Sequence, residues 1–488
     1  MNPRPPSSRY RAALQGLQSG FTLVELMISI AIGMIIMLAL IAVYVNITRS
    51  NAEMARTNSQ IENGRFAMQI LHDDLVHAGF LGGFVPQFDD LSSYSITPAL
   101  TSTPGGSVPT SVPDPCAAVA SWTDEHKGNL IGIPVQTYEA IPAGCAALLT
   151  DKQANTDVLV VRHAETCEAG VGGCDNTAGK LYFQSTFCEA DLSGAYAQSG
   201  TTTTVKLAAT ASAIDGAYNG MTIRIVSGPG ATQYGVVSAY NGATKVATLS
   251  SAWATAPTGD SKYVFGVGYI LATAGHNLTK RDCSTLAGKR KFISSIYYVR
   301  TYANVAGDGI PTLVRSQLDL ASGAVTQQPA VALIEGIEGF KVELGIDNVS
   351  DSGIDIISDA NPLNRYTARI KWANEDNLVS PTNRGDGIPD GAFIRCTTAA
   401  PCTAEQLTHT VAAKLFVLAR GRDISPGHAD GKKYYLDSAR TTEFPPCVDA
   451  STGVALSGAA LANCQKFKRQ VFSTTVRLNN ISGRRETP

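Results

Sequence analysis

Gly20-Phe21-Thr22-Leu23-Val24-Glu25 is the stretch that decides how this chain folds. It opens an apolar run from Phe21 to Val45 in which Glu25 is the one charged residue. At 1.5 Å per residue a helix over this run is about 37 Å long, enough to cross a hydrocarbon core of about 30 Å. A carboxylate at that depth costs about 2.5–3.5 kcal/mol. Glu25 therefore needs a partner, and we interpret it as a functional residue.

The residues before the apolar run predict its orientation. Arg4, Arg9 and Arg11 precede it without any acid, and positive residues hold their side of a membrane segment in the cytoplasm. The prediction is a single pass with the N-terminus inside and the C-terminus outside. A secretory signal peptide would have a shorter apolar core followed by small residues, which are missing here. A simple signal anchor, which is an uncleaved membrane helix, would fit the hydropathy of the run but would leave the presence of Glu25 unexplained.

The helix is expected to continue beyond the membrane. No proline occurs between Asn46 and His77, and Gly79 is a suitable stop. Apolar residues recur mostly at helical spacings, which predicts an amphipathic second half whose stripe needs a sheet to cover it: Ile47, Met54, Ile61, Met68, Leu71 and Leu75. Gly64 lies inside this helix and either permits close packing or a bend, or is a tolerated defect.

Beyond Phe80 the pattern changes to strands and turns. Strands are predicted over Asp157–His163, Lys291–Tyr302 and Gln470–Asn479 from their β-branched and aromatic content. Leu415–Arg420 fits a strand, although a helix starting at His409 is an alternative. The expected fold class is α+β: a long N-terminal helix, transmembrane in its first half, packed on an antiparallel sheet that forms the head.

Residues 196–268 differ from the sequence around them. Four short strand candidates follow one another with no helical pattern between them, and Asn241-Gly242 is a hairpin turn because both residues tolerate positive φ. The candidates are Thr203–Ala209, Met221–Ser227, Tyr234–Tyr240 and Thr244–Ser250. The stretch resembles a small β module of phage tail and bacterial surface proteins, which implies an all-β insertion for display or contact. An elaborated loop of the same sheet is the alternative.

All ten cysteines follow the apolar run, and none forms a Cys-x-x-Cys pair. An even number beyond a membrane segment indicates disulfides in an oxidising compartment. Cys396 with Cys402 and Cys447 with Cys464 are near enough in sequence to pair, and the other connectivities stay open. Unpaired buried thiols are the alternative. Without histidines at zinc-ligand spacing, no metal site is predicted from these residues.

Acidic residues gather in the later loops of the sequence. Asp347, Asp351, Asp355 and Asp359 recur every four residues; Asn374-Glu375-Asp376-Asn377 and Asp386-Gly387-Ile388-Pro389-Asp390 follow. Calcium favours such oxygens around a tight turn, but the EF-hand spacing is absent and solvated Asx turns are the favoured interpretation. We therefore expect no cofactor, with calcium at these loops as the open alternative.

Other function classes find little support. The formal net charge is −2, so nothing global recruits nucleic acid. Nucleophile-elbow, zinc-protease, phosphate-loop and dinucleotide motifs are all missing from the sequence, and the expectation is a protein that is not an enzyme.

The sequence resembles the type IV prepilins, in which glycine precedes a hydrophobic residue and a glutamate lies at the fifth mature position. Asn63-Gly64-Arg65-Phe66-Ala67 and Leu71-His72-Asp73-Asp74-Leu75 resemble the stalk of PilW-type minor pilins. Further similarities are Asp157–Arg162, Ile334–Glu338 and the closing Arg469–Arg477. The resemblance covers roughly residues 15–190 and 268–480.

The resemblance implies cleavage by a prepilin peptidase between Gly20 and Phe21 and methylation of the new amine at Phe21. Glu25 would neutralise that amine, within one chain or between neighbours; a protonated, silent Glu25 is the alternative. The implied parts are a leader (1–20), a transmembrane and stalk helix (21–79), a head in two sections (80–195 and 269–488) and the insertion (196–268).

As a minor pilin, the protein would reside in inner-membrane lipid and then in a type IV pilus, from periplasm to cell surface, at its tip or in the initiating complex. Its partners would be the peptidase and other minor and major pilins. Two alternatives remain open: a pseudopilin of type II secretion, and an uncleaved membrane-anchored periplasmic enzyme or adhesin.

Overall fold

The computed structural model describes residues 22–84, 86, 109–185, 194–219, 221–231, 233–265, 269–280, 282, 284–349, 372–374, 379–381 and 385–485. The chain separates into two units, Met1–Thr57 and Asn58–Pro488. Gly20 and Phe21 lie outside the described residues, as do Asp351, Asp355, Asp359, Glu375, Asp376 and Asn377.

Helix α1 (Leu23–His77) is continuous over 55 residues. It ends where the sequence predicts, because Gly79 adopts a φ of 72° that a side chain would disfavour. Among the described residues it is the one helix long and apolar enough to cross a membrane, judged by length and composition alone.

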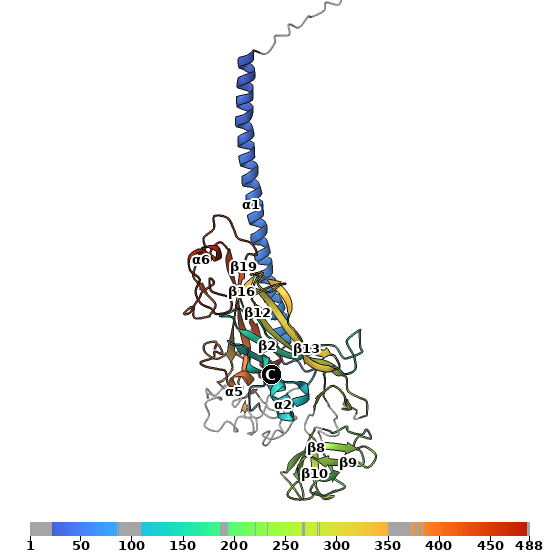
Figure 1. Cartoon of the computed structure of the whole chain (residues 1–488). Helices are drawn as coiled ribbons and strands as arrows, with labels where there is room; N and C mark the ends of the chain where they lie inside the picture. The colour runs from blue at the N-terminus through green and yellow to red at the C-terminus, as the bar shows by residue number, and fades with distance from the viewer. Residues whose placement is uncertain are drawn as a thin grey trace, which may run out of the picture. The chain divides into compact units, whose positions relative to one another are not determined.

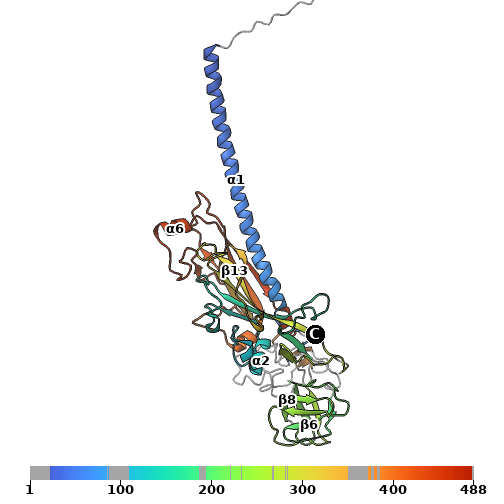
Figure 2. The same ribbon diagram turned by 45° about the vertical axis from the view of Figure 1, so that its right-hand side comes forward.

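The head contains two antiparallel sheets beside the later part of α1 (Figures 1 and 2). The larger has the order β1-β2-β12-β13-β14, with β15 on β13 and β3 joining β12 to β11. The smaller has the order β16-β19-β22. Their strands are β1 (Val135–Tyr138), β2 (Val158–Ala164), β3 (Tyr182–Ser185), β11 (Tyr269–Ala272), β12 (Lys289–Arg300), β13 (Thr312–Ala321), β14 (Ala324–Gln327), β15 (Val331–Glu335), β16 (Ile337–Ile346), β19 (Thr410–Arg420) and β22 (Arg469–Arg477).

One large apolar core joins α1 to both sheets. The helix contributes Ala67, Leu71 and Leu75, which are fully buried. Alternate residues of β2 line this core, while the intervening residues Val158 and Val160 face a second cluster beneath Cys145 and Leu149. Both faces of the larger sheet are therefore covered, which explains why β2 is buried along its whole length.

Short elements complete the described head. They are α2 (Asp124–Gly132), α5 (Ala404–Thr408), α6 (Gly458–Cys464), α7 (Asn479–Ser482), η3 (Val119–Ser121), η4 (Ala143–Cys145), β17 (Trp372–Asn374), β18 (Val379–Pro381), β20 (Tyr434–Tyr435) and β21 (Glu443–Phe444).

Residues 195–265 form a separate seven-stranded antiparallel sheet with its own aromatic core around Tyr218, Tyr263 and Phe265 (green in Figure 1). Its strands are β4 (Ala195–Tyr196), β5 (Ser199–Gly200), β6 (Thr204–Lys206), β7 (Thr222–Ser227), β8 (Tyr234–Asn241), β9 (Val246–Leu249) and β10 (Lys262–Phe265). This is the stretch for which we predict an insertion, and the division of the chain into parts stays a prediction.

The α+β fold and the four principal head strands are confirmed, and β19 is a strand that starts one residue after His409. Two details of our predictions were wrong. The β8–β9 turn places Lys245, not Asn241 or Gly242, at positive φ. Asn241 instead accepts from the Thr244 N–H at 2.8 Å, an Asx-type closure.

The second error concerns the helix stripe. Ile47 and Met54 are exposed within this chain, and the buried face consists of Gln60, Gly64, Ala67, Leu71 and Leu75. Leu71 and Leu75 of the predicted stripe are therefore confirmed, and Met68 packs against the same core. The error lies in Ile47 and Met54, and in the small and polar residues of the buried face that hydrophobicity did not indicate.

Candidate functional site

The first turn of α1 is closed by a reciprocal cap between Thr22 and Glu25. The Glu25 carboxylate accepts from the Thr22 N–H at 3.0 Å and from its hydroxyl at 2.9 Å. In return, the Thr22 hydroxyl accepts from the Glu25 N–H at 3.3 Å. This is a capping box, and although its Thr-x-x-Glu signature is present in the sequence, we did not predict it. It holds the carboxylate at the positive end of the helix dipole.

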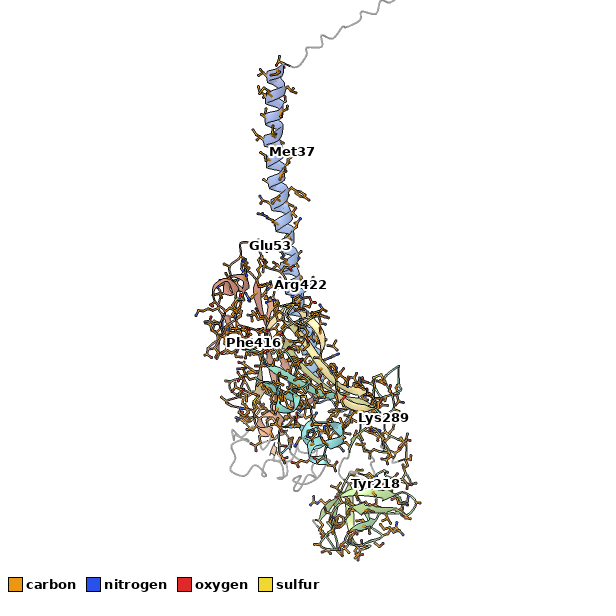
Figure 3. All side chains as sticks on the ribbon, viewed as in Figure 1. Met37, Glu53, Tyr218, Lys289, Phe416 and Arg422 are labelled. Carbon is orange, nitrogen blue, oxygen red and sulfur yellow. A yellow bond between two sulfur atoms is a disulfide. The ribbon has the colours of Figure 1, made fainter. Side chains whose placement is uncertain are left out.

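The next five turns present a continuous apolar surface that no described part of the chain covers. The large apolar side chains are between 37% and 71% exposed, and Met37 projects from the helix with no neighbouring element (Figure 3). The hydroxyls of Ser29 and Thr48 donate to the preceding turn, to Glu25 O and Tyr44 O. These two side chains are therefore satisfied within the helix itself, as an apolar environment requires.

The later part of α1 is held to the head by polar contacts as well as by its buried face. Gln60 donates to the carbonyl of Ala419 at 2.8 Å, and Asn63 donates to that of Glu335 at 3.1 Å. A Cβ atom at Gly64 would collide with the ring of Phe472 on β22. The close-packing interpretation of this glycine is therefore the correct one.

A buried ionic contact lies one turn before the end of the helix. Asp74 is 2.9 Å from Nε2 of His163 on β2 and accepts from the Tyr297 hydroxyl of β12 at 2.9 Å. Burial opposes the charged imidazole, but the hydrogen bond and the charge of Asp74 outweigh it and raise the pKa of His163. Nothing local in the sequence pairs residues so far apart.

The C-terminal segment caps the same helix end. Asn480 donates to the carbonyls of Val76 and Ala78 at 3.2 Å each, and Arg484 donates to that of Gly79 at 2.8 Å. These carbonyls have no partner within the helix, so the end of the chain supplies the missing donors.

The structure places both predicted cysteine pairs in disulfides, and every described cysteine is bonded. The bridges are Cys116–Cys145, Cys167–Cys174, Cys396–Cys402 and Cys447–Cys464. Cys188 and Cys283 lie outside the described residues. Such bridges suit an oxidising compartment.

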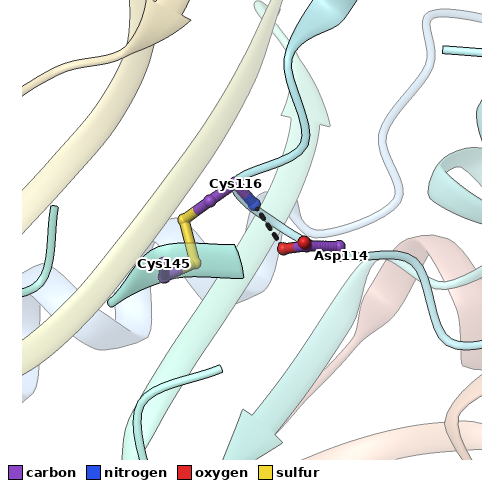
Figure 4. A group of neighbouring side chains, drawn as sticks. All are labelled: Asp114, Cys116 and Cys145. Atoms are coloured by element: carbon purple, nitrogen blue, oxygen red, sulfur yellow. Dashed lines mark hydrogen bonds between the residues drawn. A yellow bond between two sulfur atoms is a disulfide. The ribbon is translucent and has the colours of Figure 1, made fainter. Parts of the chain in front are cut away.

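Asp114, Cys116 and Cys145 are grouped closely enough to suggest a metal site, but their chemistry does not fit one (Figure 4). The two sulfurs are bonded to each other, so neither is a thiolate. Asp114 accepts from the Cys116 N–H at 3.0 Å. The group is a disulfide with a capped turn.

The described acidic residues of the later loops accept hydrogen bonds from backbone N–H groups. Asp347 accepts from the Gly387 N–H at 2.8 Å and lies 3.6 Å from Arg485, while burial raises its pKa to about 6. Asp390 accepts from the N–H groups of Asn348 and Val349, and Asp386 from that of Ile388. The Asp386 contact is an Asx turn, whereas Asp347 is fully buried and, like Asp390, joins segments about forty residues apart. Calcium at these loops stays untested.

Comparison with known proteins adds to this geometry. Residues 16–41 match the family model described as the prokaryotic N-terminal methylation motif. The start of the chain is thus similar to proteins that carry this motif. Residues 296–480 match the model for type IV pilus-assembly protein W, which confirms the resemblance to PilW-type minor pilins.

A solved structure, the type IV-like pilin TTHA1219 from Thermus thermophilus, shares 13% identity over 39% of this chain and 70% of its own, with a TM-score of 0.16. That similarity is too low to bear on the fold or function. Among curated proteins, none matches the chain.

Proposed function

We propose that this protein is a minor pilin that is cleaved between Gly20 and Phe21, methylated at Phe21 and built into a type IV pilus. The proposal rests on two observations that fall on the same segment of the chain. The methylation-motif match over residues 16–41 ends inside a helix whose apolar side chains are exposed. Such a surface needs lipid before assembly and neighbouring helices after it.

In this proposal, the Glu25 carboxylate forms the ionic contact that joins the membrane helix to the pilus during assembly. Cleavage would create a positive amine at Phe21, four residues before Glu25, whose carboxylate the capping box holds at the helix start. An amine of the same chain or of an adjacent subunit would pair with Glu25 and lower the cost of burying both charges. In the second case the pair also sets the axial step between subunits.

The head provides lateral contacts and no catalysis. Two of its acidic side chains bind within the head: Asp347 accepts from the Gly387 N–H, and Asp74 pairs with His163. Its partners are other minor and major pilins, and the prepilin peptidase acts on the leader. The protein begins in the inner membrane with its arginine-bearing leader inside and ends in the pilus. The 196–268 module serves display or subunit contact.

Mass spectrometry of the purified protein's N-terminus tests the proposal. We expect a chain that begins with methylated Phe21 when a prepilin peptidase is present, and one that begins with Met1 when the peptidase is deleted. A Met1 chain in peptidase-competent cells would reject the proposal. Deleting the gene should abolish piliation or twitching while secretion continues; the reverse phenotype would identify a type II secretion pseudopilin instead.

A further inference from the structure

Arg162 on β2 is a buried arginine whose guanidinium group uses only one of its three nitrogens in a described hydrogen bond. The other two, Nε and Nη2, form the side that we call the fork. Arg162 is 1% exposed, and its Nη1 donates to the carbonyl of Ile133 at 2.9 Å. Its Nε and Nη2 are also buried, but neither has a hydrogen-bond partner among the residues that the structure describes. Its strand, β2, lies between β1 and β12 in the larger sheet.

In two other arginines of the head, the Nε and Nη2 atoms bind a carboxylate. Arg395 donates from Nε and Nη2 to the two oxygens of Asp157, at 3.0 and 2.6 Å. Arg469 donates from the same two atoms to Glu338, at 2.5 and 3.2 Å. Both are side-on bidentate pairs with a carboxylate. Arg162 presents the same fork, yet no described carboxylate forms an ion pair with it.

The charge on Arg162 persists despite its burial. Burial lowers its pKa to about 10, so the group is still a cation at neutral pH. Asp114, the nearby acid, is exposed and accepts from the Cys116 N–H. An unpaired buried charge is among the most unfavourable arrangements in a protein, and in native structures it is paired or bound to a ligand.

The surroundings of the fork are polar. Gln136 on β1 points to the same face of the sheet, and its Oε1 is buried without a partner. Nε2 of His126 on α2 is likewise buried without a partner, and after burial itself the charge of Arg162 is the main influence that lowers the pKa of His126. Among the described residues, Gln136 shares the sheet face of Arg162 and His126 is near enough to feel its charge, so both lie on the side where a small polar ligand would bind.

We propose that the Nε–Nη2 edge of Arg162 binds a small monocarboxylate from solution, of the size of formate or acetate, through both of its oxygens. The ligand neutralises the buried cation and so stabilises the contact between β2 and the end of α2. The planar fork selects a carboxylate over a spherical anion such as chloride, because only the former accepts two parallel N–H bonds.

Thermal unfolding of the full-length protein in detergent tests this site. After exhaustive dialysis, sodium formate is compared with sodium chloride at equal ionic strength and pH. We expect a saturable rise in Tm of about 2 °C or more with formate. R162K keeps the charge but loses the fork, and should lose the rise. R422K, at a side chain that is 64% exposed, is the matched control and should retain it.

Two further measurements test the proposal when the Tm comparison fails. One applies if R162K does not fold, and the other applies if the carboxylate copurifies with the protein. Pivalate, whose tert-butyl group is too bulky for an enclosed site, should not reproduce the effect of formate. Ion chromatography after acid denaturation should release about one carboxylate per wild-type chain if the site is already filled. Equal effects of formate and pivalate, a formate effect that survives in R162K, or neither a Tm rise nor a released carboxylate would overturn the proposal.

Discussion

The two halves of helix α1 have similar backbones and opposite surroundings. In the first half, large apolar side chains such as Leu38 are exposed, and the capping box at Glu25 is the polar feature of its first turn. In the second half, Leu71 and Leu75 are fully buried and polar side chains reach the sheet. Among the described residues, the head thus covers only the second half of the helix, and in the proposed function other subunits cover the first half. Substitutions in each half can test that division.

The largest effect is expected at Glu25. E25A should still be processed but should enter pili poorly, with incorporation falling nearly to background in immunoblots of sheared pili. T22V separates two explanations, because it removes the hydroxyl of the capping box and leaves the carboxylate for the amine. Near-normal incorporation of T22V beside loss in E25A supports charge pairing. Equal loss in both would assign Glu25 to helix capping alone, and normal incorporation of E25A would refute the charge pair.

Leucine truncation compares the two halves directly. L71A removes a fully buried side chain from the main core and should lower the unfolding free energy of the head by about 2–5 kcal/mol. L38A makes the same change at a side chain that is 67% exposed, and should leave head unfolding unchanged. Denaturant titration in detergent, followed by tryptophan fluorescence, measures both. Similar losses in the two variants would show that the halves are not independent.

The sequence predicted those parts of this division that depend on local pattern. The apolar run, the stop at Gly79 and strands β2, β12 and β22 follow from periodicity and turn chemistry within a few residues. The capping box at Thr22 was equally local and could have been found. What could not be predicted are contacts between residues hundreds of positions apart, such as Tyr297 with Asp74. These depend on how strands are ordered, which no single window of sequence encodes.

The buried face of the helix shows why hydrophobicity was an incomplete guide. Helices approach sheets most closely where side chains are small, so Gly64 and Ala67 are buried while Met54 is not. Gln60 is buried because the carbonyl of Ala419 satisfies it. Arg162 belongs to a segment that resembles the family, but its unused fork is visible only once its neighbours are placed.

The two helix glycines sharpen the comparison with a smaller effect. G64A places a methyl group against the Phe472 ring and should destabilise the head by about 1–3 kcal/mol. G33A makes the same change where nothing lies within 4 Å of the new atom, so the head should unfold as in the wild type. Denaturant midpoints report both. F472L should recover part of the loss in G64A, and a G64A variant as stable as the wild type would argue against close packing.

The smallest effect is expected from pH at the pair that anchors the end of the helix. The pKa of His163 is raised in the folded protein, so folding binds its proton more tightly than the unfolded chain does. The stabilisation is therefore complete below pH about 6.5 and is lost as pH rises through the folded value. D74N should cost about 1 kcal/mol more at pH 5.5 than at pH 8.5, measured by denaturant unfolding.

The neighbouring residue provides the control for this pH dependence. Asp73 lies 3.6 Å from His72, but its side chain is 65% exposed and that of His72 is 47% exposed. Solvent screens such a pair, so D73N should behave alike at both pH values. If D74N were equally costly at both pH values, the contact would act through hydrogen bonds alone, since the Tyr297 hydroxyl also donates to Asp74. Hydrogen bonds, rather than the attraction between opposite charges, would then hold the end of α1 on the sheet.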